Sequence, residues 1–167
     1  VEGVESSDLA WSDFDGDGDL DVAIGGITER GDLVTEVLVN SGDGGLRALD
    51  GPTFPGIRGG DLVWGDFDND RDQDLVVSGN NGLKPILRIY ENTMGRADAV
   101  QPFVLEPVDS TVVTFLDFSA IALVDIDQDG DLDLISSGSE GGVSAIPRTL
   151  VNDNMTGLFN PNLQPNT

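Results

Sequence analysis

The chain has 167 residues, of which 31 are Asp or Glu and only 8 are Lys or Arg, so its formal net charge is −23 at pH 7. This charge disfavours nucleic acid and anionic membranes as partners, because both are bound through basic patches. The apolar runs are far shorter than the roughly 20 residues that span a bilayer, so we do not expect membrane insertion. The lack of Cys excludes disulfides and Cys-based metal sites, and the lack of His removes the commonest general base and transition-metal ligand.

Short β-branched and apolar segments, bounded by Gly, Asn and Asp, predict strands along the whole chain, and no helical periodicity stands out. In chain order we expect strands at 8–11, 20–24, 34–39, 61–64, 75–78, 86–90, 112–115, 120–124, 132–136 and 148–151. The Pro-containing stretches 51–60 and 101–111 are expected to cross between repeats. Residues 160–167 are expected to form an extended tail.

An acidic nonapeptide lies between the first two strands of each expected unit. It reads DFDGDGDLD at 13–21, DFDNDRDQD at 66–74 and DIDQDGDLD at 125–133. Five carboxylates this close repel one another strongly unless a cation compensates them. Ca²⁺ takes about six to eight oxygen ligands, which carboxylates and a backbone carbonyl can supply. The sequence therefore predicts about three metal sites, with Ca²⁺ as the expected ion.

The repeat extends beyond the loop. An apolar residue stands two positions before each first Asp (Trp11, Trp64 and Leu123), and an Asn follows 27, 26 and 27 positions after it (Asn40, Asn92 and Asn152). An apolar residue then closes each unit: Leu46 or Leu49, Phe103 and Phe159. We expect the Trp pair to pack between repeats, with a ligand platform as the alternative. The Asn residues are expected to stabilise turns through their side chains.

Each unit of strand, metal loop, strand, turn, strand and return segment has the content of one propeller blade. We expect an all-β protein of three antiparallel blades in a single β-repeat domain, 1–167, with repeats at about 8–50, 60–106 and 117–159. Three blades do not close a propeller, which usually has about four to eight. Further blades in cis or copies of the chain in trans are therefore the expected partners, and residues 1–7 and 160–167 could be donated as strands.

The pieces WSDFDGDGDLDVAIGG, WGDFDNDRDQDLVVSG and LVDIDQDGDLDLISSG, with the downstream VLVN, RIYEN and TLVN, resemble FG-GAP/VCBS repeats. These are calcium-loop β-propeller repeats that also occur in integrin α-subunit heads, and the resemblance covers about residues 8–159. It implies that the Asp side chains at loop positions 1, 3, 5 and 9 and the carbonyl at position 7 hold calcium. Carried over, the metal-binding residues are Asp13, Asp15, Asp17, Asp19 and Asp21; Asp66, Asp68, Asp70, Asp72 and Asp74; and Asp125, Asp127, Asp129, Asp131 and Asp133, with Asp19, Asp72 and Asp131 contributing the carbonyl.

Loop position six is Gly18 and Gly130 in the outer loops but Arg71 in the middle one. Glycine there permits a sharp turn with positive φ, which costs another residue about 1 kcal/mol or more. We therefore expect loop two to bind its ion most weakly. An EF-hand is disfavoured because position twelve carries no Glu and the flanks are strand-like. Solvated acidic turns without metal and a two-metal hydrolase are weaker alternatives.

No recognisable catalytic set is present, so we do not expect an enzyme. The expected function is a calcium-binding, non-catalytic module for adhesion or for surface or filament structure. It is expected to be extracellular or on the cell surface, where millimolar calcium suits such loops. The alternative is a carbohydrate-binding, lectin-like module of a longer secreted protein, for which a possible glycan ligand would be the partner.

Overall fold

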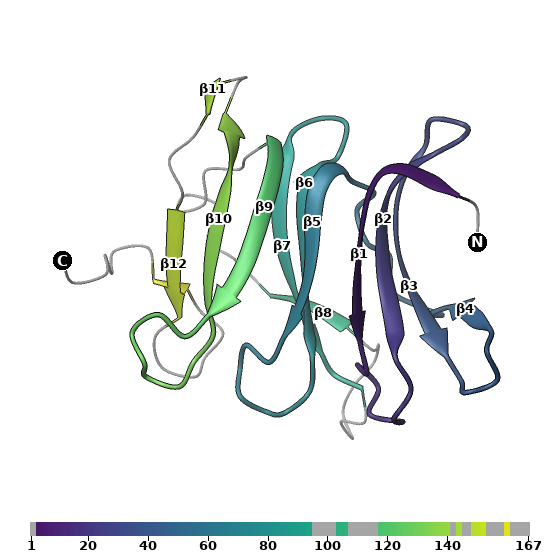
Figure 1. Cartoon of the computed structure of the whole chain (residues 1–167), viewed down its shortest axis with the longest axis horizontal. Coiled ribbons are helices and arrows are strands. Elements are labelled where there is room, and N and C mark those ends of the chain that lie inside the picture. The colour runs from purple at the N-terminus through teal and green to yellow at the C-terminus, as the bar shows by residue number, and fades with distance from the viewer. Residues whose placement is uncertain are drawn as a thin grey trace.

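The computed structural model describes residues 3–94, 103–106, 117–140, 143–144, 148–152 and 159–160. In these ranges every helix or strand assigned is a β-strand, and the strands form three separate antiparallel sheets (Figure 1). This confirms the expected all-β fold built from propeller-type blades. No helix in the described ranges is long and apolar enough to cross a membrane.

The first sheet, blade 1, consists of β1 (Val4–Ser12), β2 (Asp21–Thr28), β3 (Leu33–Asn40) and β4 (Leu46–Ala48), hydrogen-bonded in that order. Blade 2 repeats this order with β5 (Arg58–Gly65), β6 (Asp74–Asn80), β7 (Pro85–Asn92) and β8 (Phe103–Glu106). The two sheets therefore have the same up-and-down meander.

Blade 3 contains β9 (Asp117–Val124), β10 (Asp133–Glu140), β12 (Arg148–Asn152) and β13 (Phe159–Asn160), while the short β11 (Val143–Ser144) pairs with the end of β10. The register of the first two strands is the same in all three blades. The residue two before the loop faces the residue nine after the loop's first Asp: Trp11↔Val22, Trp64↔Leu75 and Leu123↔Leu134.

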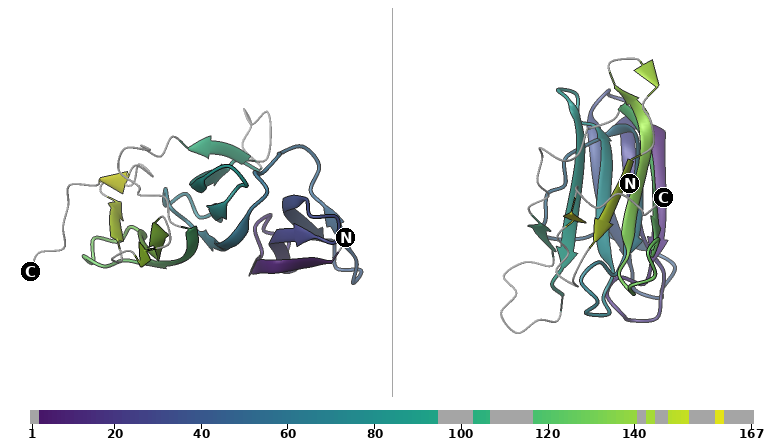
Figure 2. Two further views of the ribbon diagram at one scale, coloured as in Figure 1. Left: turned by 90° about the horizontal axis from the view of Figure 1, so that it is seen from above. Right: turned by 90° about the vertical axis from the view of Figure 1, so that its left-hand side faces the viewer.

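The three blades stand side by side along an arc, with the first strand of blade 2, β5, next to both β1 and β9 (Figure 2). One hydrophobic core lies between blades 1 and 2 and a second between blades 2 and 3. The first core centres on Phe14, Leu62 and Leu75, and the second on Phe67, Ile121 and Leu134. In the described ranges the arc is open at both ends, as expected for a chain that does not close a propeller.

The fourth strand of each blade was missed as a strand by the sequence prediction. Each begins opposite the Asn that ends the third strand: Asn40↔Leu46, Asn92↔Phe103 and Asn152↔Phe159. These strands are only two to four residues long, too short to show an alternation. The interpretation of 101–111 as a crossing is wrong for Phe103–Glu106, which form β8. The expected strand at 112–115 lies outside the described residues.

The N-terminal arm proposed for strand donation is also partly wrong. Val4 and Glu5 pair with Thr28 and Ile27 inside blade 1, so residues from Val4 onward already belong to a sheet. In the other proposed arm, only Asn160 lies in the described ranges, where it pairs with Val151.

Candidate metal centres

The three acidic loops join the first and second strands of their blades and lie at the same end of the molecule, the lower end in Figure 1. Their main chains are held in nearly the same way. The first Asp of each loop accepts a hydrogen bond from the position-six amide at 3.1 Å, and the donors are Gly18, Arg71 and Gly130. These bonds fold each loop back on its first carboxylate.

A second set of bonds tightens each loop further. The position-five carboxylate accepts from the position-seven amide at 2.9 Å in loop one, 3.1 Å in loop two and 3.0 Å in loop three. In the first two loops the position-three carboxylate also accepts from the position-five amide. Side chains at positions 1, 3 and 5 are therefore fixed by the backbone that carries them.

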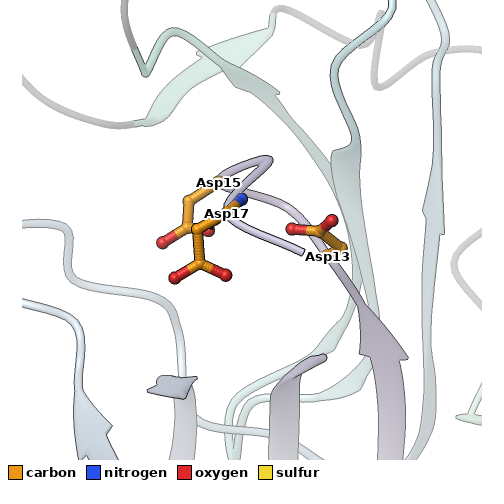
Figure 3. Close-up of side chains that lie close together, drawn as sticks. All are labelled: Asp13, Asp15 and Asp17. Atoms are coloured by element: carbon orange, nitrogen blue, oxygen red, sulfur yellow. Dashed lines mark hydrogen bonds between the residues drawn. The ribbon is translucent and has the colours of Figure 1, made fainter. Parts of the chain in front are cut away.

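This folding brings carboxylate oxygens together in each loop. Asp13, Asp15 and Asp17 each place one oxygen within 4.8 Å of the other two, and the same holds for Asp66, Asp68 and Asp70. Figure 3 shows the first group, with the Asp13 carboxylate facing those of Asp15 and Asp17. The third group is Asp125, Asp127 and Asp133, so in loop three position nine takes the place of position five.

The last Asp of loops one and two has a structural role that was not predicted from the sequence. Asp74 is buried and accepts from the Phe67 amide at 2.9 Å and from the Asn92 amide at 2.8 Å. Asp21 does the same with Phe14 at 3.3 Å and Asn40 at 2.8 Å. This carboxylate therefore ties the loop to the third strand. The sequence signal for this role is that an Asn follows the last Asp at a similar spacing in each repeat, as in Asp21 with Asn40 and Asp74 with Asn92.

The Asp at position seven lies outside all three oxygen clusters: Asp19, Asp72 and Asp131. Asp129, at position five of loop three, also lies outside its cluster. Instead of facing its own loop's cluster, the buried Asp131 carboxylate accepts a 2.5 Å hydrogen bond from the Asn69 side-chain amide in loop two. This bond couples the second loop directly to the third.

Position six is left-handed in every loop, with φ of +95° at Gly18, +80° at Arg71 and +101° at Gly130. The expected strain at Arg71 is therefore present in the structure. Position four is left-handed as well, with φ of +73° at Gly16, +60° at Asn69 and +62° at Gln128. This second turn was not predicted from the sequence, although Gly and Asn, which occupy it in loops one and two, are the residues that tolerate positive φ best.

Two oxygens provide a test of whether a cation fits these loops. Asp13 Oδ1 and Asp66 Oδ1 are inaccessible to solvent and have no hydrogen-bond partner, although the other oxygen of each carboxylate is bonded to the backbone. A buried carboxylate oxygen without a hydrogen-bond partner is costly. An oxygen-only donor set suits hard cations such as Ca²⁺ or Mg²⁺. The residues present thus fit a calcium ion.

The electrostatics agree with this donor set. Burial raises the pKa of Asp15, and the neighbouring Asp17, Asp13 and Asp19 raise it further. Burial raises the pKa of Asp74 to about 7, although its two backbone hydrogen bonds act in the opposite direction. A nearby divalent cation would favour the charged form of both groups.

The flanking residues have separate roles. Trp64 stacks on Phe14 of blade 1 with ring centroids 5.5 Å apart, and its Nε1 donates to the Ala10 carbonyl at 3.1 Å. This confirms the expected inter-blade position for Trp64. The same expectation is wrong for Trp11 in this structure, where the side chain is 52% exposed.

The Asn side chains do cap turns as expected. Asn40 Oδ1 accepts from the Gly42 amide at 3.1 Å, and Asn92 Oδ1 accepts from the Met94 amide at 3.0 Å. Asn92 Nδ2 also donates to the Phe14 carbonyl at 2.8 Å, which joins blade 2 to the loop of blade 1. The side chain of Asn152 lies outside the described residues.

The fold and the three loops define a β-propeller-type repeat module whose blades each carry an acidic loop between the first two strands. Residues 13–77 match the family model described as an FG-GAP-like repeat. The match runs from the first Asp of loop one to β6 of blade 2, so this part of the chain is similar to an FG-GAP-like repeat. No curated protein matches the chain significantly.

Proposed function

We propose that this chain is a non-catalytic, calcium-binding repeat module in which one Ca²⁺ in each loop stabilises its blade. The single observation that carries the proposal is the pair of buried oxygens, Asp13 Oδ1 and Asp66 Oδ1, that face no protein donor at repeat-equivalent positions. The same carboxylates belong to the clusters of converging oxygens. A cation would satisfy oxygens that the protein itself leaves without a hydrogen bond.

The residues proposed to hold the ions are those at positions 1, 3 and 5 of loops one and two and those at positions 1, 3 and 9 of loop three. The bound ion supplies positive charge that offsets the repulsion among neighbouring carboxylates. The chain's contribution is to fix the loop through the backbone bonds to Asp13, Asp66 and Asp125. An ion that binds only the folded state at about 100 times its Kd adds about 2.7 kcal/mol to the free energy of unfolding.

We further propose an extracellular or cell-surface setting, with a role in adhesion or in surface or filament structure. Support comes from the FG-GAP-like repeat and from the net charge of −23, which favours divalent cations and basic partners. Calcium sites of extracellular modules bind with Kd values on the order of 0.1–1 mM. Sites of this strength fill where calcium is millimolar and stay empty at cytosolic levels.

Calorimetric titration of the chain with CaCl₂, and separately with MgCl₂, tests the calcium proposal. We expect about three calcium sites and weaker magnesium binding, because flexible, carboxylate-rich loops accommodate Ca²⁺ better than the octahedral Mg²⁺. Thermal unfolding should show a calcium-dependent rise in Tm that excess EGTA reverses. The proposal would be overturned if calcium produced no heat of binding and no shift in Tm.

The substitution Asp13→Asn makes the test specific, because an amide oxygen can still accept the bond from Gly18 but the negative charge is removed. We expect this variant to be more stable than the natural chain in EGTA, where repulsion dominates, and to gain less stability from calcium. Asp50→Asn, an exposed residue outside the loops, removes the same charge as a matched control. Equal calcium responses in all three proteins would contradict the assignment of loop one.

A further inference from the structure

The same hydrogen bond joins each blade to the next. Asp8 in β1 accepts from the Leu62 amide in β5 at 2.8 Å, and Asp61 in β5 accepts from the Ile121 amide in β9 at 2.8 Å. Both acids stand five residues before the first Asp of their loop, and both donors stand four before theirs. One carboxylate per blade thus fastens the first strand of the following blade.

Apolar side chains at and near each donor residue pack against the preceding blade. In blade 2 these are Leu62, which is 2% exposed, and Trp64, which stacks on Phe14. In blade 3, Leu123 and Leu132 occupy the equivalent face and pack into the core shared with blade 2. We call this side of a blade its incoming face, and the side that receives it the outgoing face of the preceding blade.

The outgoing face of blade 2 admits blade 3 because residue 65 is glycine. A Cβ placed on Gly65 would lie 2.5 Å from Leu123 Cδ1 and 3.0 Å from Leu132 Cδ1. Any larger residue would therefore push these leucines away. Ser12 is the small residue at the equivalent position of blade 1.

Blade 1 has the same incoming face, yet this face is open to solvent. Leu9 is 51% exposed, Trp11 52% and Leu20 56%, although their equivalents Leu62, Trp64 and Leu132 pack against a preceding blade. The pairing Leu9↔Ile24 has the same register as Leu62↔Val77, so the Leu9 amide points away from β2 as the Leu62 amide points away from β6. The Leu9 amide and three exposed apolar side chains therefore lie on the face of blade 1 at this end of the arc.

Blade 3 lacks the features with which blades 1 and 2 bind the blade that follows them. Ala120 replaces the carboxylate of Asp8 and Asp61, and Val124, which is 39% exposed, replaces the small residue at Gly65. Alanine has no side-chain oxygen to accept a bond from an incoming amide, and the valine side chain occupies the space that glycine leaves open. Blade 3 of a second copy is therefore a poor match for the incoming face of blade 1.

We propose that the incoming face of blade 1, formed by Leu9, Trp11 and Leu20, binds a further FG-GAP-type blade with an acid at the position of Asp61 and a small residue at the position of Gly65. The occupant is defined by these two residues, and blade 3 of a second copy, which has Ala120 and Val124 at these positions, does not meet the definition. This inference rests on the proposed repeat-module function and specifies its partner. The two equivalent interfaces within the molecule, between blades 1 and 2 and between blades 2 and 3, identify this occupant.

A repaired copy of the chain can serve as the probe. The donor protein carries Ala120→Asp and Val124→Gly, which give blade 3 the outgoing residues of blade 2, together with Trp11→Ser, which blocks its own incoming face. The acceptor is the natural chain. In sedimentation velocity with about 2 mM calcium, we expect each protein alone to be monomeric and their mixture to form a complex of one donor with one acceptor.

Matched controls separate the required contacts. A donor without Ala120→Asp should bind the natural chain at least about ten-fold more weakly, and an acceptor with Trp11→Ser should not bind. A second donor that adds Ile126→Phe supplies the aromatic ring found at Phe14 and Phe67, and should bind at least as tightly as the first. Circular dichroism spectra matching that of the natural chain would show that the variants fold.

Two results would overturn the proposal. One is a mixture that stays monomeric with both donors although all proteins are folded. The other is self-association of the natural chain that Trp11→Ser abolishes, because blade 3 of a second copy would then be a sufficient partner. Calcium binding is measured on the natural chain alone, so its failure leaves the pairing result readable, and a failed pairing leaves the calcium result intact.

Discussion

Replacing Arg71 with Gly should stabilise the chain and strengthen calcium binding in loop two. Arg71 has φ of +80°, whereas Gly18 and Gly130 occupy the equivalent position in the other loops. An added Cβ at Gly18 or Gly130 would meet nothing within 4 Å, so this position selects glycine through its backbone conformation alone. Crowding therefore plays no part in the expected effect.

The magnitude follows from two opposing terms. A left-handed conformation costs an L-residue about 1–2 kcal/mol, and Gly loses about 0.4–1 kcal/mol more than other residues through the freedom of its unfolded chain. The net gain in the free energy of unfolding is about 1 kcal/mol, or a rise in Tm of about 2–4 °C for a chain of this size. Removing a positive charge near a divalent ion favours binding by a further amount on the order of 1 kcal/mol, or about five-fold in Kd.

Three variants separate the two terms. Arg71→Lys keeps both the charge and the strain, Arg71→Ala removes only the charge, and Arg71→Gly removes both. We expect Arg71→Ala and Arg71→Gly to bind calcium with similar gains, which shrink as salt is added. In EGTA, Arg71→Gly should have a higher free energy of unfolding than Arg71→Ala, which has lost the same charge but keeps the strain, as measured by urea denaturation.

The mirror substitution Gly18→Arg should weaken loop one and lower stability by a comparable amount. The reasoning fails if Arg71→Gly unfolds in EGTA at the same urea concentration as Arg71→Ala, because strain at positive φ would then contribute nothing. It fails also if Gly18→Arg leaves both stability and calcium affinity unchanged.

Three further predictions concern residues that join blades. Burial and a hydrogen bond to Asp8 raise the pKa of Asp61 to about 6. Between its unfolded pKa of 3.8 and this value, the folded state keeps a proton that the unfolded chain loses. The free energy of unfolding should therefore fall as pH rises from about 4 to 6. Asp61→Asn should flatten that part of the pH profile, and an unchanged slope would show that Asp61 does not titrate as described. Trp64→Ala should lower the free energy of unfolding by about 3 kcal/mol, whereas the exposed Trp11→Ala should change it by less than about 0.5 kcal/mol; similar losses in denaturant titrations would contradict the assigned packing. Asn92→Ala removes a bond to Met94 and a buried bond to the Phe14 carbonyl, so we expect a loss of about 1–3 kcal/mol, and a neutral result would exclude a role in joining the blades.

The sequence by itself determined the parts of this protein that depend on local spacing. Three acidic nonapeptides predicted the loops, and the φ of +80° at Arg71 was expected because glycine holds the equivalent place twice. Strands such as β6 and β7 were found because their apolar runs are long enough to be distinctive. In each case the signal lies within a few residues of the feature it predicts.

Only the tertiary structure decided which residues at the same repeat position also have the same surroundings. Trp11 and Trp64 occupy the same repeat position, but Trp64 meets Phe14 of a preceding blade and Trp11 faces solvent. The short β8 forms because β7 offers it an edge, and the hydrogen bonds of Asp8 and Asp61 to the following blades join residues 54 and 60 positions apart. Such contacts depend on which blade lies next to which, and sequence periodicity gives every repeat the same pattern whether or not it has a neighbour.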